Sequence, residues 1–145
     1  MLIRSAEALW EGNLKQGKGK MKLGSGLFEG NYSFGTRFEH ASGTNPEELI
    51  GAAHAGCFSM ALSLILEQAG YKVDHIRTKA RVAIDKVGDG YKITTIDLDT
   101  EGAVPGIDEK NFKEAAEAAK KGCPVSMALT GVEIRLSAKL ERKAA

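Results

Sequence analysis

The architecture follows from the segment Asn45-Pro46-Glu47-Glu48-Leu49-Ile50-Gly51-Ala52-Ala53-His54-Ala55-Gly56-Cys57-Phe58-Ser59-Met60-Ala61-Leu62, which has the sequence features of a buried helix. Asn45 is a good N-cap, and Pro46 suits the first helical position because no partner is needed there for its missing N–H. Glu47 and Glu48 face the positive helix end, with Glu48 at the capping-box position. We therefore expect a helix to begin at Pro46.

This helix is expected to be buried on all sides. From Leu49 to Leu66 there is no Asp, Glu, Lys or Arg, and Gly70 provides a stop. A run of this length also reaches the threshold for a membrane span, but Gly, Ala, Ser and His dilute its hydropathy, so we predict no membrane. One small sheet covers only one side of such a helix, so the sequence predicts that a second chain covers the other.

Size and composition place the chain among ordinary globular proteins. It has 145 residues, 43% hydrophobic and 27% charged, which predicts one domain over residues 1–145. A net charge of +1 gives no reason to expect nucleic acid or an anionic membrane as a partner. Glu7 lies where a secretory signal needs an apolar run, so we expect a cytoplasmic protein, in which two cysteines favour redox or nucleophilic chemistry.

The remaining pattern predicts an α+β fold in which sheet covers helix. Expected strands are 6–11, 18–23, 32–39, 76–85, 91–101 and 132–141, with a bulge near Thr94-Thr95. Asp108 is expected to cap a second helix that ends at Gly122, directly before Cys123.

Cys57 lies several turns from the helix N-terminus, so the helix dipole does not activate its thiol. Arg37 is the favoured activating cation, and Glu47 would hold its guanidinium in a bidentate pair. The alternative is that Arg37 is a solvated strand residue and Glu47 only complements the helix dipole.

Spacing adds a constraint on this site. Glu47 and Cys57 are ten residues apart, about 15 Å along one helix, too far to serve one site in a single straight helix. An antiparallel copy of the helix from a second chain would bring Glu47 level with the partner's Cys57. Small residues near the midpoint, from Gly51 to Gly56, would let the two backbones approach.

Other uses of these side chains are open. His54 is three residues before Cys57 and either tunes the thiol or is a packed histidine satisfied by a backbone carbonyl. A zinc site of His54, Cys57 and Cys123 would have only three ligands and no Cys-x-x-Cys pair. A cysteine hydrolase lacks a Cys-His-acid set, because His40 and His75 lie in unrelated segments.

The sequence resembles the OsmC/Ohr family along essentially its whole length. The resemblance is carried by the segment 45–64, by Thr36-Arg37-Phe38-Glu39 before it, and by Ala103-Val104-Pro105-Gly106-Ile107-Asp108 and Gly122-Cys123-Pro124-Val125-Ser126 after it. Ala8-Leu9-Trp10-Glu11-Gly12 extends the match toward the start, and His54 before Ala55-Gly56-Cys57 is typical of the OsmC branch.

The resemblance implies a fold of antiparallel sheets wrapped around long central helices in an intertwined homodimer. It implies a thiol peroxidase that reduces organic hydroperoxides and, more weakly, hydrogen peroxide. Cys57 would be the peroxidatic cysteine, Cys123 the resolving cysteine that forms a disulfide with it, and Arg37 and Glu47 the charged pair. A dithiol, carried in this family by lipoyl-bearing proteins, would recycle the enzyme, with no metal or flavin.

The substrate entrance and the function each have an alternative interpretation. Phe38, Phe58, Met60 and Met127 would form an apolar substrate entrance, unless they are ordinary core residues. The alternative function is a stress-related dimer that binds a small ligand, in which the cysteines are structural or inert.

Overall fold

The computed structural model describes residues 1–141 of the chain. The chain divides into two compact units, Met1–Leu49 and Ile50–Ala145. The sequence predicted one domain, and this stays a prediction.

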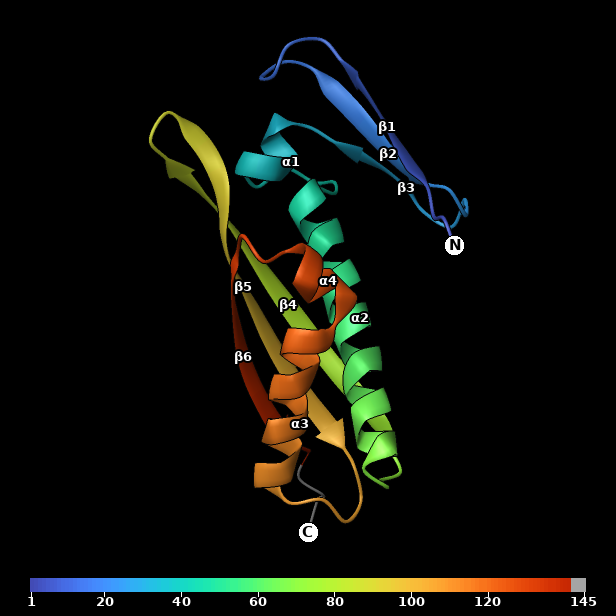
Figure 1. Ribbon diagram of the computed structural model, residues 1–145. Coiled ribbons are helices and arrows are strands. Elements are labelled where there is room, and N and C mark those ends of the chain that lie inside the picture. Colours follow the sequence, from blue (N-terminus) through green and yellow to red (C-terminus); the bar gives the residue numbers. More distant parts are fainter. Residues whose placement is uncertain (142–145) are drawn as a thin grey trace. The chain divides into compact units, whose positions relative to one another are not determined.

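The first unit is built on a three-stranded antiparallel sheet. Its strands β1 (Ala6–Glu11), β2 (Lys18–Leu23) and β3 (Glu29–Tyr32) lie in chain order (Figure 1). The rings of Trp10 and Tyr32, on the two outer strands, are 5.4 Å apart across Gly19 of the middle strand. A Cβ at Gly19 would come within 3 Å of both rings, so this close packing requires glycine.

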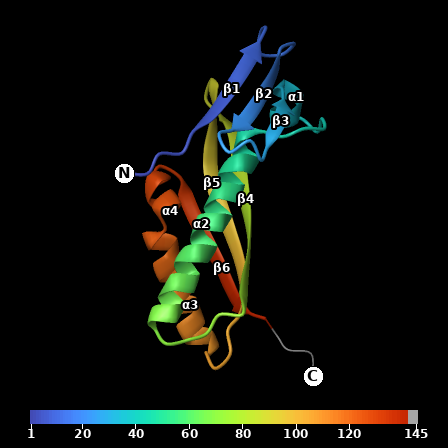
Figure 2. The same cartoon turned by 90° about the vertical axis from the view of Figure 1, so that its right-hand side faces the viewer.

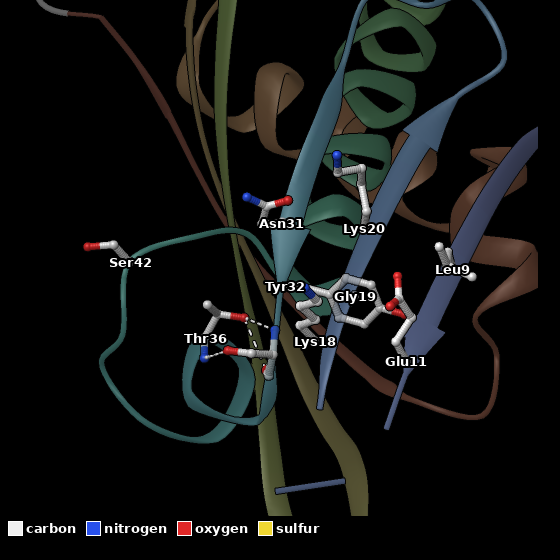
Figure 3. A pocket seen from close by; sticks show the side chains of 10 residues that line it. Leu9, Glu11, Lys18, Gly19, Lys20, Asn31, Tyr32, Thr36 and Ser42 are labelled. Carbon is white, nitrogen blue, oxygen red and sulfur yellow. Dashed lines mark hydrogen bonds between the residues drawn. The ribbon is translucent and has the colours of Figure 1, made fainter. Parts of the chain in front are cut away.

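The strand predicted over residues 32–39 is wrong, because the chain turns into the short helix α1 (Phe34–Phe38) after Tyr32. Ser33 and Thr36 form a capping box, in which each side chain accepts a hydrogen bond from the other residue's N–H. The rings of Phe34 and Phe38, one helical turn apart, pack at 5.0 Å. Figure 3 shows side chains that line a hollow of about 440 Å³ on this sheet, among them Glu11, Lys18, Lys20 and Thr36.

The long helix α2 (Pro46–Gln68) begins where the sequence predicts. The Asn45 side chain accepts a hydrogen bond of 2.7 Å from the N–H of Glu48. The Glu48 carboxylate does not complete a capping box; it accepts instead from the hydroxyl of Thr44. Gly70, at φ +92°, follows the end of the helix.

The second unit contains a three-stranded sheet in the order β4 (His75–Val87), β5 (Gly90–Ala103), β6 (Glu133–Leu140). β4 and β5 pair antiparallel, and the predicted bulge is present, since Ala83 pairs with Thr95 and Ile84 with Ile93. β6 pairs parallel to β5, which corrects the expectation of purely antiparallel sheets. The helices α3 (Glu109–Gly122) and α4 (Pro124–Ala128) form the crossover that a parallel pair needs.

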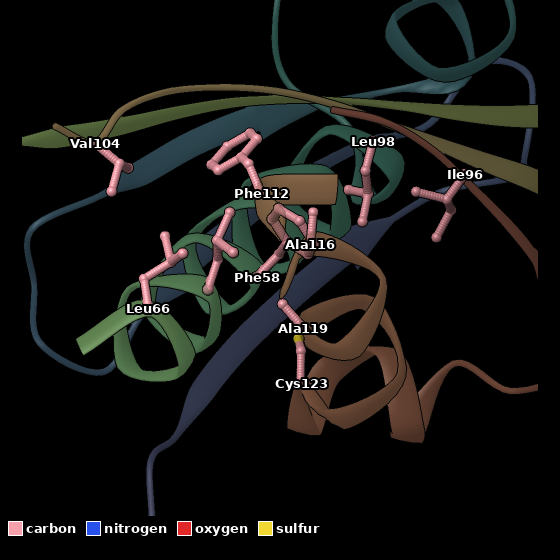
Figure 4. Packing of buried hydrophobic residues seen from close by; sticks show 10 residues of the cluster. Phe58, Leu66, Ile96, Leu98, Val104, Phe112, Ala116, Ala119 and Cys123 are labelled. Atoms are coloured by element: carbon pink, nitrogen blue, oxygen red, sulfur yellow. The ribbon is translucent and has the colours of Figure 1, made fainter. Parts of the chain in front are cut away.

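Helices α2 and α3 lie side by side on one face of this sheet (Figure 2). Figure 4 shows Phe58 and Leu66 of α2, Phe112 and Ala116 of α3, and Ile96 and Leu98 of β5 directed into one core. Asp108 caps α3 as predicted, accepting a hydrogen bond of 2.7 Å from the N–H of Asn111. The core therefore fixes α2 against the end of α3, where Cys123 lies.

Only one side of α2 is covered within the described chain. Phe58, Leu62 and Leu66 are buried, whereas Met60 is 77% and Leu64 54% exposed. By length and composition α2 is also able to cross a membrane, as are many core helices of soluble proteins. The buried face of α2, with Phe58, Leu62 and Leu66, packs in the core of the second unit.

Candidate active site

Two sulfur atoms meet between α2 and the junction of α3 and α4. Cys57 Sγ and Cys123 Sγ lie 2.9 Å apart, within a thiol–thiol hydrogen bond, and both cysteines are free. Cys57 is partly exposed and Cys123 is buried. The pair therefore has one sulfur that solvent reaches and one held behind it.

The position of Cys123 follows from two helix ends. Its N–H donates to the carbonyl of Ala119 at the end of α3, and its side chain caps α4, accepting from the N–H of Ser126 at 3.5 Å. Pro124 occupies the first position of α4, where its missing N–H costs nothing. Capping at both ends holds the sulfur toward α2.

The surroundings shift the pKa values of the two thiols in opposite directions. Burial raises the pKa of Cys57, the hydrogen bond with Cys123 raises it further, and the Val125 N–H opposes this. Burial would also raise the pKa of Cys123, but hydrogen bonds from Cys57, Ser126 and Val125 outweigh it and lower the pKa. Within this unit a negative charge is thus more stable on Cys123, and activation of Cys57 needs a further cation.

Arg37 and Glu47 form the ion pair that the sequence predicted. Arg37 Nε donates to Glu47 Oε1 at 2.9 Å and Nη2 donates to the same oxygen at 2.8 Å. The side chain of Glu47 is only 6% exposed and that of Arg37 36%. A buried carboxylate held in this way fixes the orientation of the guanidinium. Arg37 is on the helix α1, not on a strand.

Arg37 also borders an apolar cavity of about 230 Å³ in the first unit. Aromatic and aliphatic side chains form most of its wall: Trp10, Leu14, Tyr32, Phe34 and Phe38. The Arg37 guanidinium lies 5.2 Å from the centre of the Phe38 ring, within range of a cation–π interaction. A charged group at the edge of an apolar cavity suits a ligand with one polar end.

The four residues expected at a substrate entrance have different environments. Phe38 lines this cavity. Phe58 has no exposed surface and packs in the core, which agrees with the alternative given above. Met60 and Met127 are 77% and 60% exposed, so in the single chain they lie on its surface.

His54 contacts a residue to which the sequence assigned no role. Its Nε2 lies 2.7 Å from the hydroxyl of Ser126, so its partner is a side chain and not the expected backbone carbonyl. The available signal was the spacing Cys123-Pro124-Val125-Ser126, which places Ser126 three residues after an N-cap. Within residues 1–141, His54, Cys57 and Cys123 do not form a group able to hold a metal ion.

The fold and the sulfur pair define an α+β protein with a two-cysteine thiol centre. The chain belongs to the OsmC family, since residues 39–137 match the model of the OsmC-like proteins. It is 52% identical over 139 residues to the peroxiredoxin OsmC of Escherichia coli strain K12, covering 95% of this chain and 96% of that protein. It is 32% identical over 104 residues to the organic hydroperoxide resistance protein OhrB of Bacillus subtilis strain 168, covering 70% and 74%.

A solved structure supports the same assignment. The crystal structure of OhrB of Bacillus subtilis superimposes with a TM-score of 0.75 at 25% identity, covering 93% of this chain and 98% of that chain. The expected OsmC/Ohr resemblance and the α+β fold class are therefore confirmed.

Proposed function

We propose that this protein is a cysteine-based peroxidase that reduces organic hydroperoxides to alcohols and acts more weakly on hydrogen peroxide. The observation that carries the proposal is the 2.9 Å separation of Cys57 and Cys123. The names of the two relatives, a peroxiredoxin and an organic hydroperoxide resistance protein, support this reaction class.

The two sulfurs would act in sequence. The Cys57 thiolate attacks the terminal peroxide oxygen, the O–O bond breaks, and the alkoxide leaves as an alcohol after taking a proton. Cys57 is then a sulfenic acid, and Cys123 attacks its sulfur to release water and form the Cys57–Cys123 disulfide. Because Cys57 is the more accessible sulfur, it is the one that meets the peroxide first.

Arg37 would supply the cation that Cys57 lacks within its own unit. A guanidinium stays charged at physiological pH, favours the thiolate, and donates to the departing oxygen as charge develops on it. Glu47 holds Arg37 through Nε and Nη2, so Nη1 is left for the reacting group.

The Arg37–Glu47 pair would come from a partner subunit in a homodimer. Glu47 and Cys57 are ten residues apart on α2, about 15 Å along its axis. The other side of α2 presents Met60 and Leu64 to solvent, and a Cβ built at Gly56 meets no atom within 4 Å. An antiparallel α2 from a second chain would cover this apolar face and bring Arg37 of the partner subunit to Cys57.

The apolar cavity beside Arg37 favours hydroperoxides that carry a hydrocarbon group over hydrogen peroxide, which has none. Turnover then requires a dithiol to exchange with the Cys57–Cys123 disulfide, and a lipoyl-bearing protein is the expected donor. We expect one functional domain that works in the cytoplasm and needs neither metal nor flavin.

The alternative function is a stress-related ligand-binding dimer with inert cysteines. One observation supports this alternative: burial raises the pKa of Cys57, which makes its thiol less reactive. Hydroperoxide consumption separates the two functions. We would mix the protein with dihydrolipoamide and with one of three substrates: tert-butyl hydroperoxide, linoleic acid hydroperoxide or hydrogen peroxide. The measurement is the amount of peroxide that remains. A peroxidase consumes the organic peroxides catalytically, with hydrogen peroxide slower. A protein with inert thiols consumes none above the rate of the reductant alone.

A further inference from the structure

A buried hydrogen-bonded chain leads from α2 to the sulfur of Cys123. His54 on α2 has no exposed surface, and Ser126 on α4 is only 4% exposed. His54 Nε2 lies 2.7 Å from Ser126 Oγ, and the Ser126 N–H donates to Cys123 Sγ at 3.5 Å. Ser126 therefore contacts the imidazole through its hydroxyl and the sulfur through its backbone N–H, and its side chain also hydrogen-bonds to Cys123.

The Ser126 hydroxyl has one proton, so it donates to only one neighbour at a time. When it donates to His54 Nε2, its oxygen is free to accept the S–H of Cys123. When it donates to the sulfur, where it lowers the pKa of Cys123, its oxygen accepts an N–H from His54 Nε2. The first arrangement suits a Cys123 thiol, and the second suits a Cys123 thiolate.

The histidine is costly to bury without such a role. Its second ring nitrogen, Nδ1, is buried and has no hydrogen-bond partner among the described residues. Burial lowers the pKa of His54, so the ring is neutral near pH 7 and would hold an added proton only transiently before returning it. An apolar side chain would fill the same space without a buried unpaired nitrogen.

We propose that Ser126 and His54 form a proton relay that deprotonates Cys123 when it attacks oxidised Cys57. The proposal rests on the proposed peroxidase function and adds to it an assignment of the proton acceptor for the resolving step. Ser126 contacts the reacting sulfur, and His54 is a positioning residue that acts through Ser126.

The resolving step then balances as follows. The Cys123 S–H proton passes to Ser126 Oγ while the Ser126 proton passes to His54 Nε2. The freed electron pair on Cys123 Sγ forms the S–S bond, and the S–O bond of the Cys57 sulfenic acid breaks to give hydroxide. Hydroxide takes up the proton that the relay returns and leaves as water. One sulfur is oxidised and the other reduced, so no external electron is needed.

Single-turnover kinetics separates this role from the first chemical step. Wild type, Ser126→Ala, Ser126→Thr and His54→Gln would each receive one equivalent of tert-butyl hydroperoxide. Peroxide loss reports oxidation of Cys57, and loss of free thiols reports disulfide formation. His40→Gln, a change at an exposed histidine outside the relay, is the matched control, and circular dichroism checks folding.

Ser126→Ala and His54→Gln are expected to oxidise Cys57 at the wild-type rate and to form the disulfide about 100-fold more slowly. Dimedone, which reacts with sulfenic acids, should trap Cys57 in these variants and little in wild type. Ser126→Thr keeps the hydroxyl and should restore disulfide formation. Wild-type disulfide formation in His54→Gln would overturn the relay, since glutamine keeps a hydrogen bond but takes no proton. Equal slowing of both steps would also overturn it.

A second measurement does not depend on peroxide chemistry. In a Cys57→Ser background, the ultraviolet absorbance of the thiolate gives the pKa of Cys123 directly. Ser126→Ala should raise that pKa, and Ser126→Thr should leave it close to the parent value. If wild type fails to react with peroxide, the proposed function fails, but this titration still tests the contact from Ser126 to Cys123. An unchanged pKa in Ser126→Ala contradicts the relay.

Discussion

Cys57 Sγ lies 2.9 Å from Cys123 Sγ, although Cys57 lies within α2, Cys123 lies between α3 and α4, and the two residues are 66 positions apart in sequence. A disulfide requires sulfurs about 2 Å apart, so closing the bond needs a shift of about 1 Å. Cys123 is held by caps at both helix ends, and Cys57 by the packing of Phe58 in the core. The fold thus provides the two thiols as a preformed pair.

Replacement of Cys57 and replacement of Cys123 should have different effects on hydroperoxide consumption. Cys57→Ser should consume no hydroperoxide, because the attacking sulfur is gone. Cys123→Ser should consume one equivalent and then stop, because the sulfenic acid has no resolving thiol. Stoichiometric titration with tert-butyl hydroperoxide measures both, and catalytic turnover by Cys57→Ser would show that another group is the nucleophile.

Arg37 should matter through its shape as well as its charge. Arg37→Lys keeps the positive charge but loses the bidentate contact with Glu47, so we expect oxidation of Cys57 to slow at least about 10-fold. Arg77→Lys, at an exposed position of β4, is the control and should have wild-type rates. Stopped-flow oxidation rates test this, and equal rates in both variants would remove Arg37 from the site.

Substitution of Gly56 should test whether α2 packs against α2 of a second chain. Its Cβ position is open in the single chain, so Gly56→Leu creates no clash there, but it would obstruct an α2 packed across it. We expect this variant to be monomeric by light scattering and to lose at least about 10-fold in peroxidase rate, because Arg37 of the partner subunit is lost. Gly131→Leu, also in open space, should stay dimeric and active. A dimeric, active Gly56→Leu would contradict the proposed interface.

Local sequence signals predicted most elements correctly. Asn45 and Asp108 set the starts of α2 and α3 through their own side chains, and the bulge at Thr94 was visible as a shift in the apolar phase. Such features are encoded within a few residues, so they can be predicted without the rest of the fold. The residues alone left the Arg37–Glu47 pair open, with a solvated arginine as the alternative, and the family resemblance favoured the pair.

The remaining features depend on tertiary packing. Ser33 and Thr36 convert an expected strand into α1 by a capping box that a two-residue alternation hides. The parallel pairing of β6 depends on the crossover through α3 and α4, which periodicity does not reveal. Ser126 contacts a histidine 72 positions away, and no local pattern joins them.

The buried histidine should make stability depend on pH in a defined direction. Burial lowers the pKa of His54 below its ordinary value of 6.5, so below that pH the unfolded chain binds a proton that the folded chain resists. The free energy of unfolding should therefore fall as pH drops below 6.5, by up to about 1.4 kcal/mol per pH unit from this residue.

His54→Gln lacks this contribution, while its other titrating groups are unchanged. Urea unfolding at about pH 7.5 and about pH 5.5 should show a smaller loss of stability in His54→Gln than in wild type. Equal losses would mean that His54 is protonated in the folded protein as easily as in the unfolded chain.

The most direct test of the account is peptide mapping by mass spectrometry after wild-type protein has reacted with one equivalent of tert-butyl hydroperoxide. We predict one linked species, in which the peptides of Cys57 and Cys123 are joined and two hydrogens are lost. Recovery of both cysteines as unmodified thiols, with the peroxide unconsumed, would contradict it.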